Sequence, residues 1–238
     1  MRSLFYLHFF CFLYYSVLAW YTLVKTRQQK VTQGAMLGLI LFVCKMSSLI
    51  NVCGYNAITL HDGRTLIVTK YVEWSLCSPL WSYMILDGYQ CNPIDSFQGM
   101  IFSMSFCICG VGTALANLFW LKLYLCCQGI LSCLIVLRLL WLVAVKPPHE
   151  SRLSRMNLVM TSITYPMFLL TWGLGQDCYG VITHESEMIV TASLSIGMKS
   201  LAVLYVLTDE EYLSYANLIW EIPNNVFMVV RGVLLNIH

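Results

Sequence analysis

One lysine stands in the middle of the last long apolar stretch of the sequence. Lys199 is the only charged residue between Met188 and Thr208, and in a helix rising 1.5 Å per residue it would lie roughly 18 Å from the start. A charge at that depth in a bilayer costs at least about 2.5–3.5 kcal/mol, which makes Lys199 a candidate functional residue. Three explanations stay open: an ion pair, a Schiff base with a carbonyl ligand, or a water-filled cavity.

Glu73 is the acid best placed to pair with Lys199. It precedes Trp74 in the third apolar stretch of the chain. The third and seventh stretches of a seven-helix bundle cross the membrane in the same direction, so Glu73 is expected slightly outside the Lys199 backbone. A buried cation and carboxylate stabilise each other's charged forms in a medium of low dielectric constant.

The composition indicates that these two residues lie in a membrane protein. The chain is 58% apolar, and only 11% of its residues are charged, about half the usual share for a soluble domain. A helix needs about 20 mainly apolar residues to cross a bilayer. We predict an all-α membrane protein, a seven-transmembrane-helix bundle of the cell membrane, with spans at residues 4–24, 31–61, 70–86, 96–121, 123–145, 156–176 and 188–208.

Loop charges predict the orientation of this bundle. Lys25, Arg27 and Lys30 crowd the first loop, whereas the sixth, residues 176–187, has neither Lys nor Arg. Because basic loops stay in the cytoplasm, the N-terminus is expected outside and the C-terminus inside. We expect one seven-helix transmembrane domain, residues 1–208, and a cytoplasmic tail, residues 209–238, which either packs at the intracellular mouth or lies at the membrane interface.

Most of the 11 cysteines lie in apolar stretches and are expected to be small buried hydrophobic residues. No spacing of Cys and His typical of a metal site is found. We therefore expect no metal, no enzyme activity and no nucleic-acid partner.

Residues 70–79, KYVEWSLCSP, resemble the third-helix signature of microbial rhodopsins. That signature is a basic residue, Tyr, any residue, an acid, Trp, two residues, two small polar residues and Pro. Tyr165-Pro166 is similar to a pair in the sixth helix of the family, and Lys199 falls where the family has its retinal lysine.

The resemblance implies a fold, a cofactor and a set of site residues. Lys199 would form the Schiff base of all-trans retinal, Glu73 would be its counterion, and Lys70 would replace the usual outer Arg. The other positions expected around the retinal are Trp74, Cys77, Ser78, Pro79, Tyr165, Pro166, Leu169 and Ser195.

Several positions depart from the family pattern. Ser195 stands where a second carboxylate is usual, and Met84 stands where proton pumps have a donor acid. In the sixth helix, Ser162 replaces an expected Trp and Leu169 an expected aromatic residue, for which Trp172 is a partial substitute. The missing donor predicts that the chain is not an efficient proton pump.

The resemblance is strongest to channelrhodopsins, which tolerate the loss of the donor acid. We expect a light-gated ion channel that conducts cations; the alternatives are an anion channel and a sensory photoreceptor. The ion pathway is expected to include Lys45, Lys70, Asn51, Ser47 and Ser103. Ser103 or Ser105 is the expected fourth-helix partner of Ser78. The expected partners are retinal, lipid, ions and further copies of the chain in a dimer or trimer.

Overall fold

The computed structural model describes residues 2–25, 31–55, 57–60, 65–144 and 152–207. Within these ranges the chain forms seven long helices and one short hairpin. The helices are α1 (Arg2–Lys25), α2 (Val31–Val52), α3 (Val68–Gly88), α4 (Pro93–Leu115), α5 (Phe119–Ala144), α6 (Arg152–Leu174) and α7 (His184–Leu207). The prediction of a seven-helix bundle is confirmed.

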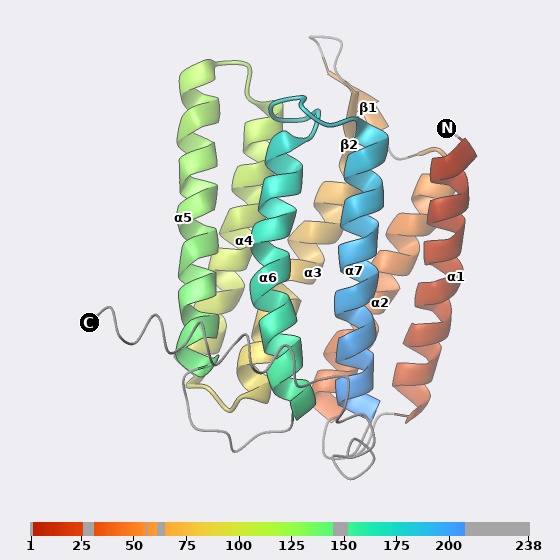
Figure 1. Ribbon diagram of the computed structural model, residues 1–238, viewed down its shortest axis with the longest axis vertical. Coiled ribbons are helices and arrows are strands. Elements are labelled where there is room, and N and C mark those ends of the chain that lie inside the picture. The colour runs from red at the N-terminus through yellow and green to blue at the C-terminus, as the bar shows by residue number, and fades with distance from the viewer. Residues whose placement is uncertain (1, 26–30, 56, 61–64, 145–151, 208–238) are drawn as a thin grey trace.

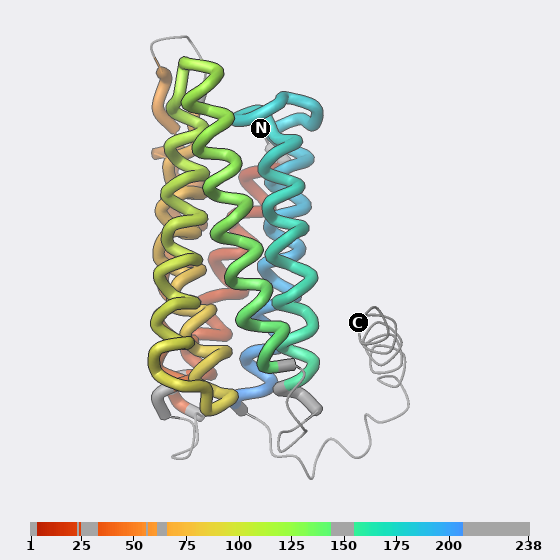
Figure 2. Tube along the Cα trace, turned by 90° about the vertical axis from the view of Figure 1, so that its left-hand side faces the viewer, coloured from red at the N-terminus to blue at the C-terminus, as the bar shows by residue number. Residues whose placement is uncertain are grey.

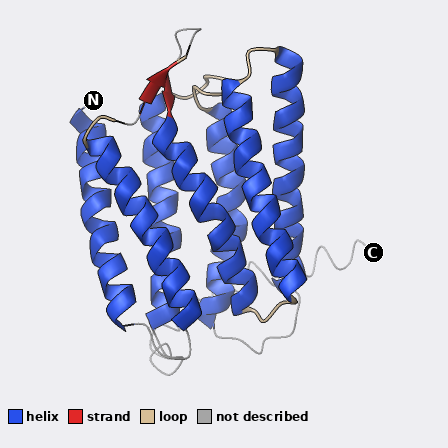
Figure 3. Ribbon diagram, turned by 180° about the vertical axis from the view of Figure 1, so that it is seen from behind, coloured by secondary structure: helices blue, strands red, loops and turns tan. Residues whose placement is uncertain are grey.

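The helices pack side by side in a closed ring, because each contacts the next along the chain and α7 returns to α1. All seven run roughly along the long axis of the molecule (Figure 2). The end that holds the hairpin and the start of α1 (Figure 3) is called the outer end here, following the orientation that the loop charges predict. The predicted tail, residues 209–238, lies outside the described residues.

By length and composition, five of the helices can each cross a bilayer: α1, α2, α4, α5 and α7. In α1 the side chains of His8, Cys11, Tyr15 and Ala19 are buried, at the spacing of one helix face. The opposite face exposes large apolar side chains, including Trp20 at 65%. Lipid is the solvent that suits such a surface, so the chain is a multi-pass membrane protein.

Two predicted spans were longer than the helices that form. The second was expected to reach residue 61, but α2 ends at Val52, and Gly54 adopts a φ of +78° that favours glycine. An antiparallel hairpin follows, in which β1 (Ala57–Thr59) pairs with β2 (Thr65–Ile67). The fourth was expected to reach residue 121, but α4 ends at Leu115. Apolar residues continue across that break, so hydropathy alone could not place it.

Candidate functional site

The Lys199 amine lies at the centre of the bundle, on the side where α7 meets α1, α2 and α3. Lys199 is 3% exposed. Its Nζ is 3.3 Å from Oε1 of Glu73 and 2.7 Å from Sγ of Cys44, and it donates a hydrogen bond to Oγ of Ser195. It also lies 4.9 Å from the centre of the Tyr15 ring. The predicted Lys199–Glu73 pair therefore forms across two helices.

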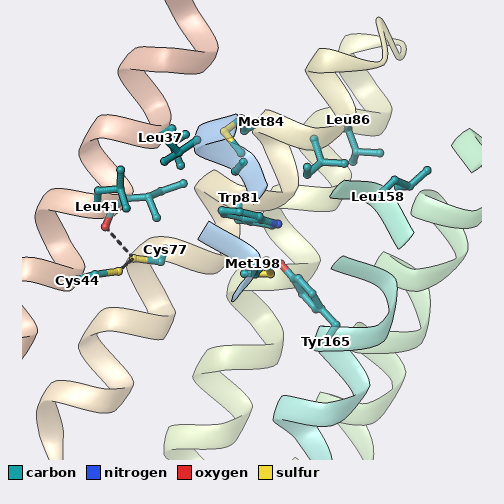
Figure 4. Packing of buried hydrophobic residues seen from close by; sticks show 14 of the residues in the cluster. Leu37, Leu41, Cys44, Cys77, Trp81, Met84, Leu86, Leu158, Tyr165 and Met198 are labelled. Atoms are coloured by element: carbon teal, nitrogen blue, oxygen red, sulfur yellow. Dashed lines mark hydrogen bonds between the residues drawn. The ribbon is translucent and has the colours of Figure 1, made fainter. Parts of the chain in front are cut away.

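Two further side chains, Tyr15 and Cys77, contact the partners of Lys199. The Tyr15 hydroxyl donates to Oγ of Ser195 at 3.1 Å, and the Cys44 and Cys77 sulfurs are 3.7 Å apart. Figure 4 shows the two thiols facing one another between α2 and α3. The Lys199 nitrogen thus faces a carboxylate, a hydroxyl and a thiol, which together satisfy a buried ammonium or iminium group.

A cavity adjoins the amine, and its empty volume of about 550 Å³ includes open solvent. Rings and apolar side chains dominate its lining, which consists of Ile40, Glu73, Trp74, Cys77, Ser78, Trp81, Phe106, Tyr165, Phe168, Ser195, Met198 and Lys199. The α3 members lie at positions i, i+1, i+4, i+5 and i+8, counted from Glu73, which places them on one face of that helix.

The lining brings together most but not all of the residues predicted around the ligand. Pro166, one residue beyond Tyr165, is exposed on the far side of α6. Leu169 packs between the two apolar core clusters, and Pro79 is buried off the pocket face of α3. Trp172 lies at the outer end, where its Nε1 donates to the Tyr71 hydroxyl at 3.1 Å, so it does not replace the missing α6 aromatic residue.

Five pocket residues were missed by the sequence prediction: Ile40, Trp81, Phe106, Phe168 and Met198. Trp81 could have been found, because it lies eight residues after Glu73 and so shares its helix face. Phe168 packs edge-on against Trp74, with ring centres 5.6 Å apart. It supplies the aromatic wall that was expected one residue later, at Leu169.

The Tyr165 hydroxyl joins three helices at the inner side of the pocket. It lies 2.7 Å from Oγ of Ser82 and donates to the backbone oxygen of Ser78 at 3.1 Å. Ser103 of α4 joins this group, 2.5 Å from Ser82 Oγ and fully buried. Ser103 therefore lies in an interhelical hydrogen-bond network and not against the Ser78 side chain as expected.

The other predicted α4 partner of Ser78 is also placed elsewhere. Ser105 lies 3.1 Å from Ser132 of α5. At this level of α3 it is Cys107 that reaches across, with its thiol donating to the backbone oxygen of Trp74 at 3.4 Å.

A buried ion cluster lies at the outer end of the bundle. The Lys70 amine lies 2.6 Å from Oδ2 of Asp177 and 2.8 Å from Oε1 of Glu187. The Tyr71 hydroxyl donates to Asp177 at 2.7 Å. Lys70 is 4% and Glu187 0% exposed, so the amine predicted for an ion pathway is held between two acids that sequence reasoning did not identify.

Three other predicted pathway residues lie on the outer half of α2: Lys45, Ser47 and Asn51. Asn51 accepts a hydrogen bond from Thr69 at 2.6 Å, and its amide lies 3.4 Å from Nδ1 of His8. Ser47 is buried, and its hydroxyl has no hydrogen-bond partner within the described part of the chain. The half-buried Lys45 points toward α1, 5.7 Å from the centre of the Phe12 ring.

The core therefore changes character along the bundle axis. Outward of Lys199, buried polar side chains line α1, α2, α3 and α7: His8, Ser47, Ser48, Thr69, Thr191 and Ser195. Inward of it, the buried side chains of α2, α3 and α7 are mostly apolar and closely packed: Leu37, Leu41, Met84, Leu86, Val203 and Val206 (Figure 4). The Met84 position, where a proton donor would lie, is within this apolar half.

No protein-family model matches the sequence, and no curated protein matches it either. Solved structures do match the chain. A thermophilic rhodopsin from Rubrobacter xylanophilus superposes with a TM-score of 0.75 at 15% identity, covering 85% of this chain and 96% of its own. A cyanorhodopsin from the cyanobacterium Calothrix sp. gives 0.77 at 14% identity, covering 90% and 98%. The light-driven proton pump rhodopsin of Coccomyxa subellipsoidea gives 0.77 at 14%, covering 86% and 97%. The chain has the fold of these rhodopsins.

Proposed function

We propose that this chain is a retinal-binding photoreceptor of the microbial rhodopsin type that works as a light-gated ion channel of the cell membrane, and not as an enzyme. One observation carries the retinal assignment. Among the described residues, Lys199 is the only lysine that lines the cavity, and its amine is buried 3.3 Å from a carboxylate.

The chemistry of the pocket lining suits a long apolar aldehyde. Aromatic and apolar side chains would hold the polyene, and the Lys199 amine is the group that forms a Schiff base with a carbonyl. Bound there, all-trans retinal would supply visible-light absorption and a change of shape on illumination. Glu73 would balance the positive charge at the nitrogen, while Ser195 and Cys44 would fix the direction of that nitrogen. The packed rings would keep bulk water out.

The inner half of the bundle argues against proton pumping, and the polar outer half supports a channel. An outward pump needs an acid that returns a proton to the nitrogen from the inside. Met84 occupies that position, is 2% exposed and packs in the apolar cluster with Leu37 and Leu86. The outer half, by contrast, offers polar side chains on α1, α2, α3 and α7 along which water and ions could enter.

We propose cations as the conducted ions, because Glu73 is the acid that faces the outer polar residues next to Lys199. The half-buried Lys45 favours anions, so ion sign is an explicit part of the test. The second candidate is a sensory photoreceptor, which the closely packed inner half favours because it seals the bundle. Assembly into a dimer or trimer is proposed as well.

The first experiment tests retinal binding. The full chain is expressed with all-trans retinal, and we expect a visible absorption band. Borohydride reduction should then leave the ligand on the peptide that contains Lys199, detected by mass spectrometry. Lys199→Ala should abolish both signals, whereas the control Lys45→Met should keep them. Wild-type protein without band or adduct would refute the proposal.

The second experiment tests the transport mode by patch clamp under illumination. A channel gives currents that reverse with the ionic gradient, and exchange of external sodium or chloride identifies the ion. Currents of one sign at all voltages would show a pump. The absence of current from protein that has the visible band would favour the sensor.

A further inference from the structure

We propose that Trp81 is the inner wall of the retinal pocket and the residue that ties this wall to α6, in place of an aromatic residue on α6 itself. This inference rests on the proposed function, because it assigns a role toward the same ligand.

Trp81 lies at the inner end of the cavity. It follows Glu73 and Cys77 at intervals of four residues on one face of α3. Figure 4 shows its indole at the centre of the packed side chains, with Met198 and Tyr165 on one side and Met84 on the other. Only 1% of Trp81 is exposed. A ligand that extends from Lys199 past Cys77 therefore meets the face of this ring.

Helix α6 offers no ring at the corresponding level. Ser162, where the resemblance to rhodopsins leads one to expect Trp, turns its hydroxyl back to the Leu158 carbonyl at 2.9 Å. The aromatic side chains that α6 contributes to the cavity are Tyr165 and Phe168, and both lie outward of Ser162. The inner wall is thus supplied by α3.

The Trp81 ring is nevertheless held by α6. Its Nε1 donates a hydrogen bond of 3.1 Å to Oγ1 of Thr161, and that hydroxyl donates to the Asn157 carbonyl at 2.7 Å. Thr161 is fully buried, so no water competes for the bond, and a buried indole N–H needs such a partner. Any displacement of the ring against the pocket therefore pulls or pushes on the inner half of α6. Trp81 is a positioning residue in this sense.

Hydrogen exchange on the full-length, retinal-free protein tests the tie between α3 and α6. Thr161→Val keeps the shape of the side chain and removes the acceptor. The matched control is Thr164→Val, one turn away, equally buried and bonded only to its own helix at Met160. We expect exchange in residues 152–163 to rise about 2- to 10-fold in Thr161→Val and Trp81→Phe, and to rise less in Thr164→Val. Equal hydrogen exchange in the two threonine variants would refute the proposal that the Trp81–Thr161 hydrogen bond couples α3 to α6.

Absorption of the retinal-loaded protein tests the wall. Trp81→Leu removes the ring and should move the absorption maximum, with Trp81→Phe moving it less. Trp120→Phe is the control, since this indole is 77% exposed on α5 and should leave the maximum unchanged. An absorption maximum that is unchanged in both Trp81 variants would refute the proposal that Trp81 forms the inner wall of the pocket. If Trp81→Leu does not fold, Trp81→Phe alone decides. Wild-type protein lacking any band would instead refute retinal binding, a result that the exchange experiment does not depend on.

Discussion

Gly175, just after α6, lies where an added side chain would displace the carboxylate of Glu187. A Cβ built there would touch Oε2 of Glu187 and approach its Cδ to 2.6 Å and its Oε1 to 3.1 Å. That Oε1 is the atom that binds the Lys70 amine at 2.8 Å. Gly175→Ala should therefore push the carboxylate away from Lys70, in a site where Glu187 is fully buried.

The expected cost follows from two effects. Overpacking a buried site costs about 1–3 kcal/mol, and losing a hydrogen bond to a charged group costs about 1.5–3 kcal/mol. Lys70 keeps Asp177 at 2.6 Å, so the cost of a fully unpaired charge does not apply. We expect the free energy of unfolding to fall by about 2–4 kcal/mol.

The chain provides a matched control two residues earlier. A Cβ at Gly173 would meet no atom within 4 Å, and Gly173 lies inside α6, where Ala is favoured by about 0.5–1 kcal/mol. Chemical unfolding in detergent micelles compares Gly175→Ala with Gly173→Ala. Adding Glu187→Asp to Gly175→Ala shortens the acid and should recover part of the loss. Equal stability of the two alanine variants would refute the reasoning.

Three further predictions concern the site and the outer polar half. Glu73→Gln removes the negative charge next to Lys199, which should shift the visible band to the red; an unshifted spectrum would contradict the counterion role. Tyr165→Phe removes the hydroxyl that joins Ser82 to the Ser78 carbonyl, so the unfolding free energy should fall by about 1–3 kcal/mol, against no change for a surface Tyr124→Phe control. Asn51→Leu removes the acceptor of Thr69 and should reduce photocurrent per molecule at the cell surface; undiminished current would remove Asn51 from the pathway.

The Lys199–Glu73 pair could be predicted because Lys199 stands alone in an apolar stretch, where membrane burial makes a charge costly, and because Glu73 lies in the third-helix motif that resembles rhodopsins. Asp177 and Glu187 could not be predicted in the same way. Asp177 lies in a loop and Glu187 in the first turn of α7, places where acids are ordinarily solvated. They lie next to Lys70 only because the fold brings together the start of α3, the loop after α6 and the start of α7.

Periodicity and hydropathy had different limits. The eight-residue spacing between Glu73 and Trp81 was enough to predict that Trp81 faces the pocket. The family pattern favoured Trp172 on α6 instead. The gap between α4 and α5, residues 116–118, was hidden because two of its three residues, Ala116 and Leu118, are as apolar as a helix interior. Lys122, expected beyond the fourth span, lies in the first turn of α5 and donates to the Cys178 carbonyl at 3.0 Å. This hydrogen bond to the loop between α6 and α7 fixes the position of the Lys122 amine, and hydropathy carries no information about it.

The packed apolar residues inward of Lys199 also have an electrical consequence. A membrane voltage falls mainly across the region of lowest dielectric constant, and here that region is the inner half, from Leu41 and Met84 to Val206. Lys199 and Glu73 then lie close to the potential of the outer solution. A proton that moves between them crosses little of the field. A charge that passes the inner half crosses most of it, at about 2.3 kcal/mol per 100 mV.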